Sequence, residues 1–286
     1  VNENIEEEFF YDLDDEFLKR SLHIKIKTIN DNQIVILLLD MTHQKNLEKI
    51  RRDFVANVSH ELRSPLTSIV GFLETMLVDG IKHKDMQLRF LNIMNEEATR
   101  MNKLIDDILS LSKVEFEEHI SPTKSISITK VLKEVISSLK KRNMTKNHKI
   151  IIKDRRKKTS RGSDLFIGNS DEMYEVFFNL IENAIKYSDL NSIINVNISL
   201  RAKGYFVIDI INRGEGIPLE NIDRVTERFY RVDKARSRKI GGTGLGLAIV
   251  KHILIKHKGK LKIFSERNKK TIFSVLLPSF IRTFEQ

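Results

Sequence analysis

Residues 179–188 read NLIENAIKYS, and all but Ser188 lie in a segment, 171–187, whose spacing predicts a helix. Its apolar side chains recur three and four residues apart, which is typical of one buried helix face. These side chains are Met173, Val176, Phe177, Leu180, Ile181, Ala184 and Ile185. Asn179, Asn183 and Lys186 follow at i, i+4 and i+7, and so share a second face. The segment therefore predicts a helix that packs on a layer of structure and presents a polar stripe on its other side.

The segments around this helix alternate between helix and strand patterns. Helices are predicted at 131–139 and 245–257, and strands at 149–153, 193–200, 205–211, 259–265 and 271–277. This order favours an α/β sandwich of helices over a mixed sheet, spanning 128–286.

Two long helical patterns precede the sandwich, at 44–79 and 85–114, with a short link around Gly80. Each carries an apolar seam at spacings of three and four. The first seam is Val58, Leu62, Leu66, Ile69, Leu73 and Met76, and the second is Leu91, Met94, Ala98, Met101, Ile105 and Ile108. A two-helix hairpin cannot bury both seams alone, so 44–114 predicts a dimeric four-helix bundle. The overall fold class is α+β.

The remaining segments lie before and between these parts. Residues 1–16 are acidic, and 22–28 and 33–39 have strand character. Because two strands alone are marginal in water, 1–43 is interpreted as the tail of a larger β-containing module. Residues 115–127 are predicted to be a polar linker.

Composition excludes several classes of function. The chain of 286 residues contains no cysteine, so disulfide scaffolds, zinc-thiolate sites and cysteine nucleophiles are excluded. The longest apolar run, 34–39, is too short to cross a bilayer, and a cytoplasmic location is expected unless a longer N-terminal region tethers the chain. The formal charge of +10 is spread along the chain with little aromatic interleaving, which does not favour a nucleic-acid partner.

A histidine stands in the first helical segment, where residues 54–66 read FVANVSHELRSPL. His60 lies two residues from Val58 and from Leu62, about 200° around the helix, so it is predicted to face solvent. Ser64 is one turn further on the same face, and Glu61 is adjacent. A neutral imidazole beside a carboxylate is a competent nucleophile, although a lone histidine of this kind is more often a surface residue of a dimerisation helix.

The polar stripe and the glycines point to a phosphate-bearing ligand. Amide oxygens of Asn179 and Asn183 can ligate Mg²⁺, and Lys186 can neutralise phosphate charge, although a solvated helix face would look the same. Residues 212–218, NRGEGIP, and 241–250, GGTGLGLAIV, place glycines after a strand and at a helix start, where backbone N–H groups bind phosphate. Residues 226–236, TERFYRVDKAR, suit a lid whose Arg231 and Arg236 contact phosphates.

Each motif alone is weak, but together and in this order they resemble those of bacterial two-component sensor histidine kinases. Residues 54–66 resemble the phospho-acceptor box, and residues 179–188 the N box of the GHKL (Bergerat) ATPase fold shared with gyrase. Residues 212–218 resemble the first glycine box, residues 226–236 the F box with the ATP lid, and residues 241–250 the second glycine box. Residues 54–76 and 226–252 look most like phosphate-regulon sensor kinases, and 22–42 resembles the end of a PAS domain joined to its signalling helix.

The resemblance implies ATP-dependent autophosphorylation of His60 with Mg²⁺, then transfer to an aspartate of a response regulator, in a homodimer. It implies catalytic roles for His60, Glu61 and Ser64, with Ser64 orienting water for regulator dephosphorylation. It assigns Asn179 and Asn183 to the metal. It assigns nucleotide binding to these two and to Lys186, Tyr187, Asn212, Gly214, Gly216, Ile217, Arg231, Arg236, Gly242, Thr243, Gly244, Leu245 and Gly246.

One residue departs from the pattern. The family has aspartate where this chain has Asn212, whose neutral amide still accepts a hydrogen bond from adenine but supplies no charge. An alternative prediction is therefore a kinase-impaired, phosphatase-biased or pseudo-kinase regulator of the same fold. Asp209 lies three residues earlier and is not expected to take the place of the family's aspartate. A non-enzymatic scaffold or nucleic-acid binder is a third hypothesis, and gyrase-like ATPases lack the His60 helix pair.

Overall fold

The computed structural model describes residues 6–14, 19–30, 33–79, 84–145, 147–156, 165–201, 205–233 and 241–279. The chain divides into two compact units, 1–67 and 68–286. Each unit is described separately.

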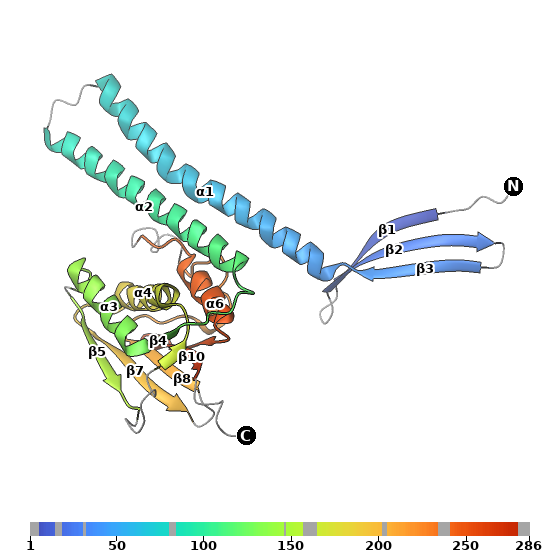
Figure 1. The fold of residues 1–286 in the computed structure, drawn as a ribbon. Coiled ribbons are helices and arrows are strands. Elements are labelled where there is room, and N and C mark those ends of the chain that lie inside the picture. Colours follow the sequence, from blue (N-terminus) through green and yellow to red (C-terminus); the bar gives the residue numbers. More distant parts are fainter. Residues whose placement is uncertain are drawn as a thin grey trace. The chain divides into compact units, whose positions relative to one another are not determined.

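The larger unit contains a five-stranded sheet in the order β5-β7-β8-β10-β9 (Figure 1). Its strands are β5 (Lys149–Asp154), β7 (Ile193–Arg201), β8 (Tyr205–Asn212), β9 (Lys260–Glu266) and β10 (Lys270–Pro278). β5 and β7 are parallel, and the other pairs are antiparallel. All five predicted strands are confirmed within one or two residues.

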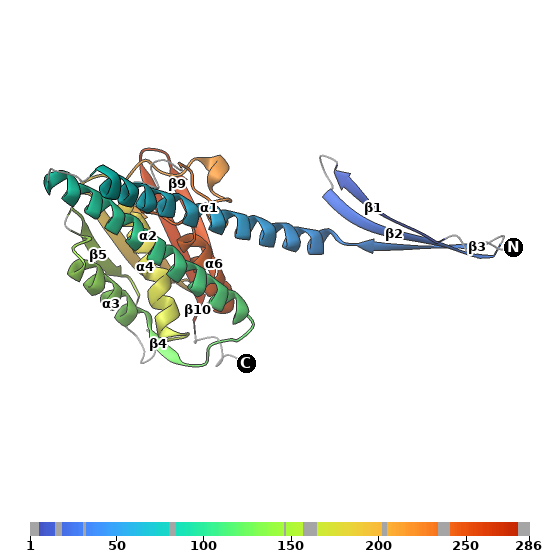
Figure 2. The same ribbon diagram turned by 90° about the horizontal axis from the view of Figure 1, so that it is seen from above.

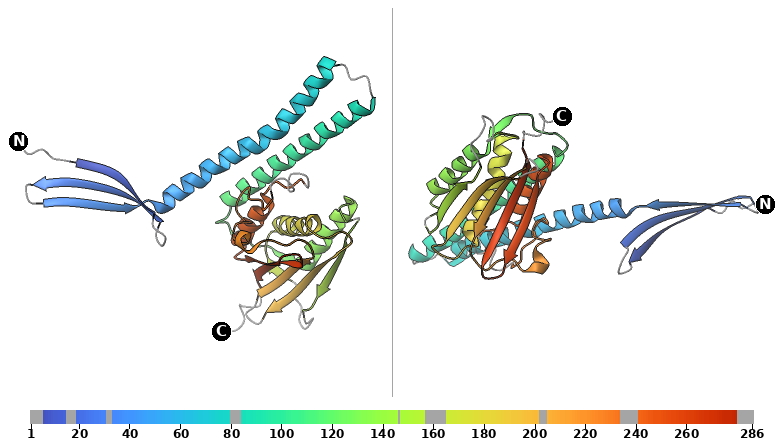
Figure 3. Two further views of the ribbon diagram at one scale, coloured as in Figure 1. Left: turned by 180° about the vertical axis from the view of Figure 1, so that it is seen from behind. Right: turned by 90° about the horizontal axis from the view of Figure 1, so that it is seen from below.

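Helices α3 (Ile128–Lys141), α4 (Ser170–Lys186) and α6 (Gly246–Lys256) cover one face of this sheet (Figure 2). Figure 3 shows the opposite face in its right-hand view. The predicted inward face of α4 is buried, since its seven apolar residues are at most 9% exposed. These side chains meet alternate residues of β8, such as Phe206, Ile208 and Ile210, which are fully buried. The α/β sandwich is thereby confirmed.

The α4 helix begins with a side-chain cap. The Asn169 Oδ1 atom accepts hydrogen bonds from the backbone N–H groups of Asp171 and Glu172, at 2.9 and 3.3 Å. These bonds satisfy N–H groups that have no partner within the helix. The two acidic residues of this first turn also complement the helix dipole. Local sequence thus fixes the start of the helix that carries the amide stripe.

Two long helices precede the sandwich, α1 (Thr42–Asp79) and α2 (Lys84–Phe116). Within the larger unit, the Phe72 ring of α1 lies 4.8 Å from the Phe90 ring of α2, as an antiparallel hairpin requires. Several seam residues stay exposed in the single chain, among them Leu73 at 45%, Leu91 at 49% and Ile105 at 42%. The described helices include none that is both long and apolar enough to span a membrane.

The smaller unit contains the first part of α1 and a three-stranded antiparallel sheet of β1 (Glu6–Asp14), β2 (Lys19–Asn30) and β3 (Gln33–Asp40). The two expected strands are present, but β1 falls where sequence analysis predicted only an acidic segment. Its pairing with β2 places Glu8 beside Lys25, at 3.1 Å between Oε2 and Nζ. Because this partner is 17 residues away in the sequence, the local pattern of residues 6–14 does not reveal the strand.

The predicted linker at 115–127 is only partly a linker. The α2 helix continues to Phe116, and β4 (Ser125–Ser127) pairs with β6 (Leu165–Ile167). The side chains of Glu115 and Glu117 make ion pairs with the sandwich, and Glu118 lies within hydrogen-bond distance of His252. A three-residue strand whose partner is 40 residues away carries no periodic signal, which is why sequence analysis missed it.

Candidate nucleotide site

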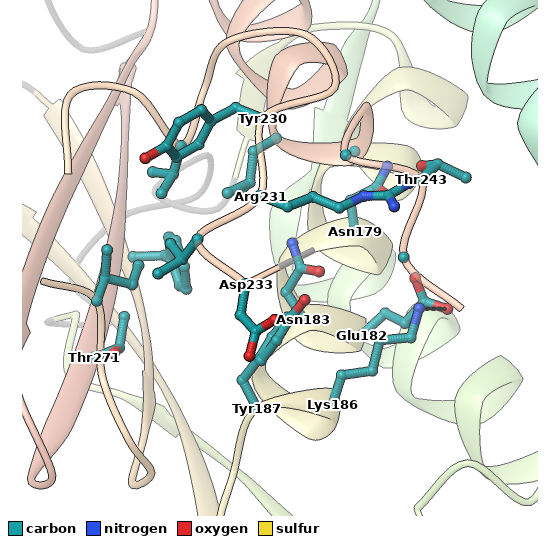
Figure 4. Close-up of a pocket in the computed structure, with 18 of the residues that line it drawn as sticks. Asn179, Glu182, Asn183, Lys186, Tyr187, Tyr230, Arg231, Asp233, Thr243 and Thr271 are labelled. Atoms are coloured by element: carbon teal, nitrogen blue, oxygen red, sulfur yellow. Dashed lines mark ion pairs between the residues drawn. The ribbon is translucent and has the colours of Figure 1, made fainter. Parts of the chain in front are cut away.

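A pocket of about 180 Å³ opens beside α4 in the larger unit (Figure 4). Five further segments converge on it: the C-terminal half of α2, the end of β8 with the loop after it, the segment 225–233, the turn that begins α6, and β10. The walls therefore come from parts of the sequence separated by more than 100 residues. Only the fold brings the predicted motifs together.

The amide stripe of α4 forms one wall of the pocket. Asn179, Asn183 and Lys186 all line it, as does Tyr187 just after the helix. The Asn179 Nδ2 group donates to the Glu175 carbonyl at 3.0 Å, which directs its Oδ1 atom toward the glycine turn. A Cβ atom on Gly246 would stand 2.7 Å from that oxygen. The amide oxygen thus faces the place where a glycine-rich turn can hold phosphate, and this orientation fits a magnesium ligand.

The turn before α6 forms the opposite wall. Gly244 has a φ of +76°, and a Cβ there would lie 2.9 Å from the backbone of Phe229. The Phe229 N–H group donates to the Gly244 carbonyl at 2.9 Å, which ties the segment 225–233 to the turn. Glycine is therefore required both for the backbone angle and for the close approach. The turn presents the first N–H groups of α6, which favour anions.

Asn212 lies at the apolar end of the pocket. It ends β8, is 4% exposed and stands in register with Thr271 of β10. Ile217, Val225 and Phe273 line the same pocket. Ile217 is held by its N–H group, which donates to the Ser265 hydroxyl at 2.8 Å. Asp209 instead accepts from the Ser274 hydroxyl at 2.6 Å and is not among the pocket residues, as expected.

The other end of the pocket is charged. The Glu182 carboxylate accepts from Lys103 Nζ at 3.0 Å and pairs with Lys186 Nζ at 3.0 Å. Burial opposes ionisation of Glu182, but the ammonium groups of Lys186 and Lys103 hold the pKa of this carboxyl below its ordinary value. Burial also lowers the pKa of Lys186. Lys186 is thus already paired with a carboxylate within the protein, which sequence analysis did not foresee.

Arg231 extends from the segment 225–233 across the pocket toward Thr243 and Asn179 in Figure 4. Asp233 lies near Asn183 and Tyr187 in the same view. Tyr230 points away, and its hydroxyl donates to Asn221 Oδ1 at 2.6 Å. A guanidinium at this place can contact phosphate with two N–H groups.

Most predicted binding residues line the pocket, whereas Gly214 and Leu245, among those that the structure describes, do not. Gly214 packs on the end of α4, where a Cβ would stand 2.1 Å from the Tyr187 carbonyl oxygen, so glycine allows a close approach there. Leu245 is fully buried and precedes α6 as a core residue. Arg236 lies outside the described residues. A linear motif does not show which of its residues pack in the core or against backbone and which line the pocket.

The predicted acceptor residues lie on α1 in the smaller unit. His60 and Ser64 are exposed, and Glu61 is partly exposed. His60 is exposed, as predicted, while Val58 and Leu62 are partly exposed. The helix continues through Pro65 to Asp79.

Sequence analysis missed the contribution of α2 to the pocket. Lys103 and Asp107 line it, and the Thr243 hydroxyl donates to Asp107 Oδ2 at 2.5 Å. Desolvation raises the pKa of Asp107. Nothing in the spacing of α2 distinguishes these residues from a solvated helix face, so no signal in the sequence alone points to them.

Comparison with known proteins gives the family. Residues 168–280 match the model of the histidine kinase-, DNA gyrase B-, and HSP90-like ATPase, and residues 50–117 match that of the His Kinase A (phospho-acceptor) domain. The chain belongs to the two-component sensor histidine kinases.

Among curated relatives, the phosphate regulon sensor protein PhoR of Pseudomonas aeruginosa is 36% identical over 259 residues. That match covers 91% of this chain and 56% of the relative. The sensor protein kinase WalK of Staphylococcus aureus is 37% identical over 246 residues, which cover 85% of this chain and 57% of the relative. The chain thus spans little more than half the length of these relatives.

Solved structures show the same fold. The Acinetobacter baumannii histidine kinase AdeS matches with a TM-score of 0.60 at 21% identity, over 77% of this chain and 98% of that one. Histidine kinase ThkA, solved in complex with response regulator protein TrrA, matches with a TM-score of 0.61 at 20% identity. That match covers 95% of this chain and 78% of ThkA.

Proposed function

We propose that this chain autophosphorylates His60 from ATP and passes the phosphoryl group to an aspartate of a response regulator. The observation that carries the proposal is the pocket itself. An amide stripe, a glycine turn at a helix start and an arginine segment converge there beneath an apolar end that fits a nucleotide base. The matched phospho-acceptor segment supplies an exposed histidine beside a carboxylate.

The chemistry follows from the residue types. A neutral ring nitrogen of His60 attacks the γ-phosphorus, a phosphorus–nitrogen bond forms, and the bond to the bridging oxygen breaks to release ADP. Glu61 orients the imidazole or accepts its proton. Phosphoryl transfer depends mainly on positioning and charge stabilisation, which Arg231 and Lys186 supply.

Asn179 and Asn183 would hold a Mg²⁺ ion, which neutralises phosphate charge when bound. The fixed orientation of Asn179 supports this assignment, because its Nδ2 group is committed to the Glu175 carbonyl and its Oδ1 atom remains for the pocket.

The proposal extends to the partner and to the reverse reaction. ThkA is a relative in fold whose structure contains a response regulator. Ser64 lies one helical turn beyond His60 and is exposed, so its hydroxyl is able to orient a water molecule for dephosphorylation of the regulator. The PhoR and WalK relatives match with nearly equal identity. Phosphate-starvation signalling is thus one pathway that fits, and the proposal names the reaction rather than the stimulus.

A homodimer is part of the same proposal. Leu73, Leu91 and Ile105 stay exposed on α1 and α2 although they belong to the predicted seams. A second hairpin would bury them in a four-helix bundle.

A second candidate is a kinase-impaired regulator of the same fold. It is favoured by one observation, the neutral Asn212 buried at the base end of the pocket. Such a chain would keep Ser64-dependent dephosphorylation while binding ATP weakly.

Incubation of the chain with Mg²⁺ and γ-labelled ATP tests the first candidate. Acid-labile label is expected on the parent chain and absent from His60→Gln. His43→Gln is the matched control, because His43 is another exposed histidine of α1, and it should label like the parent. Label that survives in His60→Gln would overturn the assignment of the acceptor. An unlabelled parent together with a labelled Asn212→Asp variant would favour the second candidate.

A further inference from the structure

The C-terminal half of α2 is docked against the nucleotide pocket by a row of polar contacts. Lys103 Nζ donates to both oxygens of Glu182 at 3.0 Å. One turn on, Asp107 accepts from Thr243 at 2.5 Å. The Ser110 hydroxyl donates to Glu175 Oε1 at 2.5 Å. Three successive turns of α2 therefore contact α4 and the glycine turn.

The row continues through the last turn of α2 and just beyond it. Glu115 pairs with Arg228 at 2.6 Å, Glu117 pairs with Lys256 at 2.9 Å, and Glu118 Oε2 lies 2.8 Å from His252 Nδ1, within hydrogen-bond distance. An acidic segment thus meets a basic surface on α6 and the segment 225–233. Beneath these contacts, Leu104, Leu111 and Val114 of α2 are at most 4% exposed.

Asp107 is placed differently from the other contacts, because its partner Thr243 belongs to the glycine turn. Thr243 stands within the glycine turn, and its Oγ1 atom also accepts from the Leu245 N–H group at 3.3 Å. The carboxylate therefore lies at the start of α6, where the helix favours an anion. Asp107 lines the same pocket as Lys186, Arg231 and the amide stripe.

We propose that Asp107 is a latch that competes with the terminal phosphates of a nucleoside triphosphate for the glycine turn. This inference rests on the proposed function of the pocket. A triphosphate at the turn would share the pocket with the Asp107 carboxylate. Two negative charges in one pocket that is shielded from water repel each other strongly. Triphosphate binding thus releases Asp107 from Thr243, and docked α2 weakens triphosphate binding, because such coupling is reciprocal.

The latch distinguishes nucleotides by their charge. ADP lacks the terminal phosphate and places less negative charge in the pocket, so it competes less with Asp107. The docked arrangement of α2 is therefore the ADP-bound or nucleotide-free form, and the triphosphate favours an undocked α2.

Calorimetric titration of the full chain with Mg²⁺ and either a non-hydrolysable ATP analogue or ADP tests the latch. Asp107→Asn and Asp107→Ala should tighten binding of the ATP analogue by about 5-fold or more, the lower end of typical allosteric coupling, and should tighten ADP binding less. Asp106→Asn is the matched control, since Asp106 is the exposed neighbour on α2 and loses the same charge. Unchanged or weaker binding of the ATP analogue by both Asp107 variants would overturn the latch while leaving the nucleotide site intact.

Absence of binding by the parent and by every variant would overturn the proposed function and the latch together. Binding by the Asp107 variants alone would support the latch.

A second measurement does not alter Asp107. The chain has no cysteine, so Ser110→Cys/Glu175→Cys can be joined by a short bis-thiol reagent that holds α2 in its docked place. The cross-linked protein should bind the ATP analogue at least several-fold more weakly than the same protein without reagent, while ADP binding changes less. The Ser110→Cys single variant treated with reagent is the control. Equal affinity before and after cross-linking would contradict the latch.

Discussion

At the scale of single residues, the base end of the pocket depends on Asn212. This side chain is 4% exposed at the end of β8, beside Thr271 and opposite the charged end. A neutral amide offers the nucleotide base one acceptor and one donor group, whereas a carboxylate offers only acceptors with full negative charge. The position therefore sets how strongly an amino group on the base is held.

Asn212→Asp should tighten ATP binding by about 5-fold, since hydrogen bonds to charged groups contribute roughly 1 kcal/mol more than neutral ones. Calorimetric titration with ATP and Mg²⁺ measures the change. Asn195→Asp adds the same charge at a position outside the pocket residues and should leave affinity unaltered. Equal or weaker binding by Asn212→Asp would show that the amide is itself adapted to the ligand.

At the scale of secondary structure, α4 is the element that carries the site, and its start is tied to the end of α6. The Asn169 N–H group donates to His257 Nε2 at 3.0 Å, so that nitrogen must be unprotonated. His257 Nδ1 then carries the proton and donates to the Ile253 carbonyl at 2.8 Å. The imidazole is fully buried in its neutral form, and burial lowers the pKa of His257 below its ordinary value of 6.5.

The free energy of unfolding should therefore fall as the pH drops below about 6.5, the ordinary histidine pKa. The unfolded chain takes up a proton there that the folded chain resists, so this contribution is complete above that pH and is lost as the pH approaches the lower folded value. Urea unfolding at a series of pH values measures how steeply the free energy of unfolding depends on pH.

His257→Gln should be less stable than the parent at neutral pH and should show a smaller slope between pH 7 and 5 (about 1.4 kcal/mol for each unit by which the pKa is lowered). His119→Gln, at an exposed histidine, should keep the parent slope. An unchanged slope in His257→Gln would show that other groups cause the pH dependence.

The long periodic elements were predictable from sequence, and the short paired ones were not. Helix α4 and strands β8 and β10 follow from their own spacing, because each buries one face in the same core. Strands β4 and β6 are stabilised by pairing with each other, and β1 is stabilised by pairing with β2. Within the site, Asn179 and Gly244 were predictable as motif residues. Asp107 was not, because docking of α2 depends on tertiary contacts.

At the scale of the whole molecule, the chain in isolation leaves apolar surface on the helical hairpin. Leu91 and Leu109 of α2 are 49% and 63% exposed. Exposed leucines that recur along two neighbouring helices indicate a partner surface. A second copy of the hairpin would provide this partner surface, with the same residues on both sides of the interface.

Leu91→Lys should shift the chain from dimer to monomer at micromolar concentration, because a charge would be buried in the bundle core without a partner. Sedimentation equilibrium measures the mass. Glu96→Lys places lysine at an exposed position off the seam and should remain dimeric. A monomeric parent chain, or a dimeric Leu91→Lys variant, would contradict this arrangement.

Identification of the phosphorylated residue shows whether His60 is the phosphoryl acceptor. The parent chain and Asn212→Asp would be incubated with ATP and Mg²⁺, digested at neutral pH and analysed by mass spectrometry under conditions that preserve phosphohistidine. We expect a phosphoryl group on the His60 ring, in the peptide that contains His60. A phosphoryl group on a different residue, or none in either protein, would contradict it.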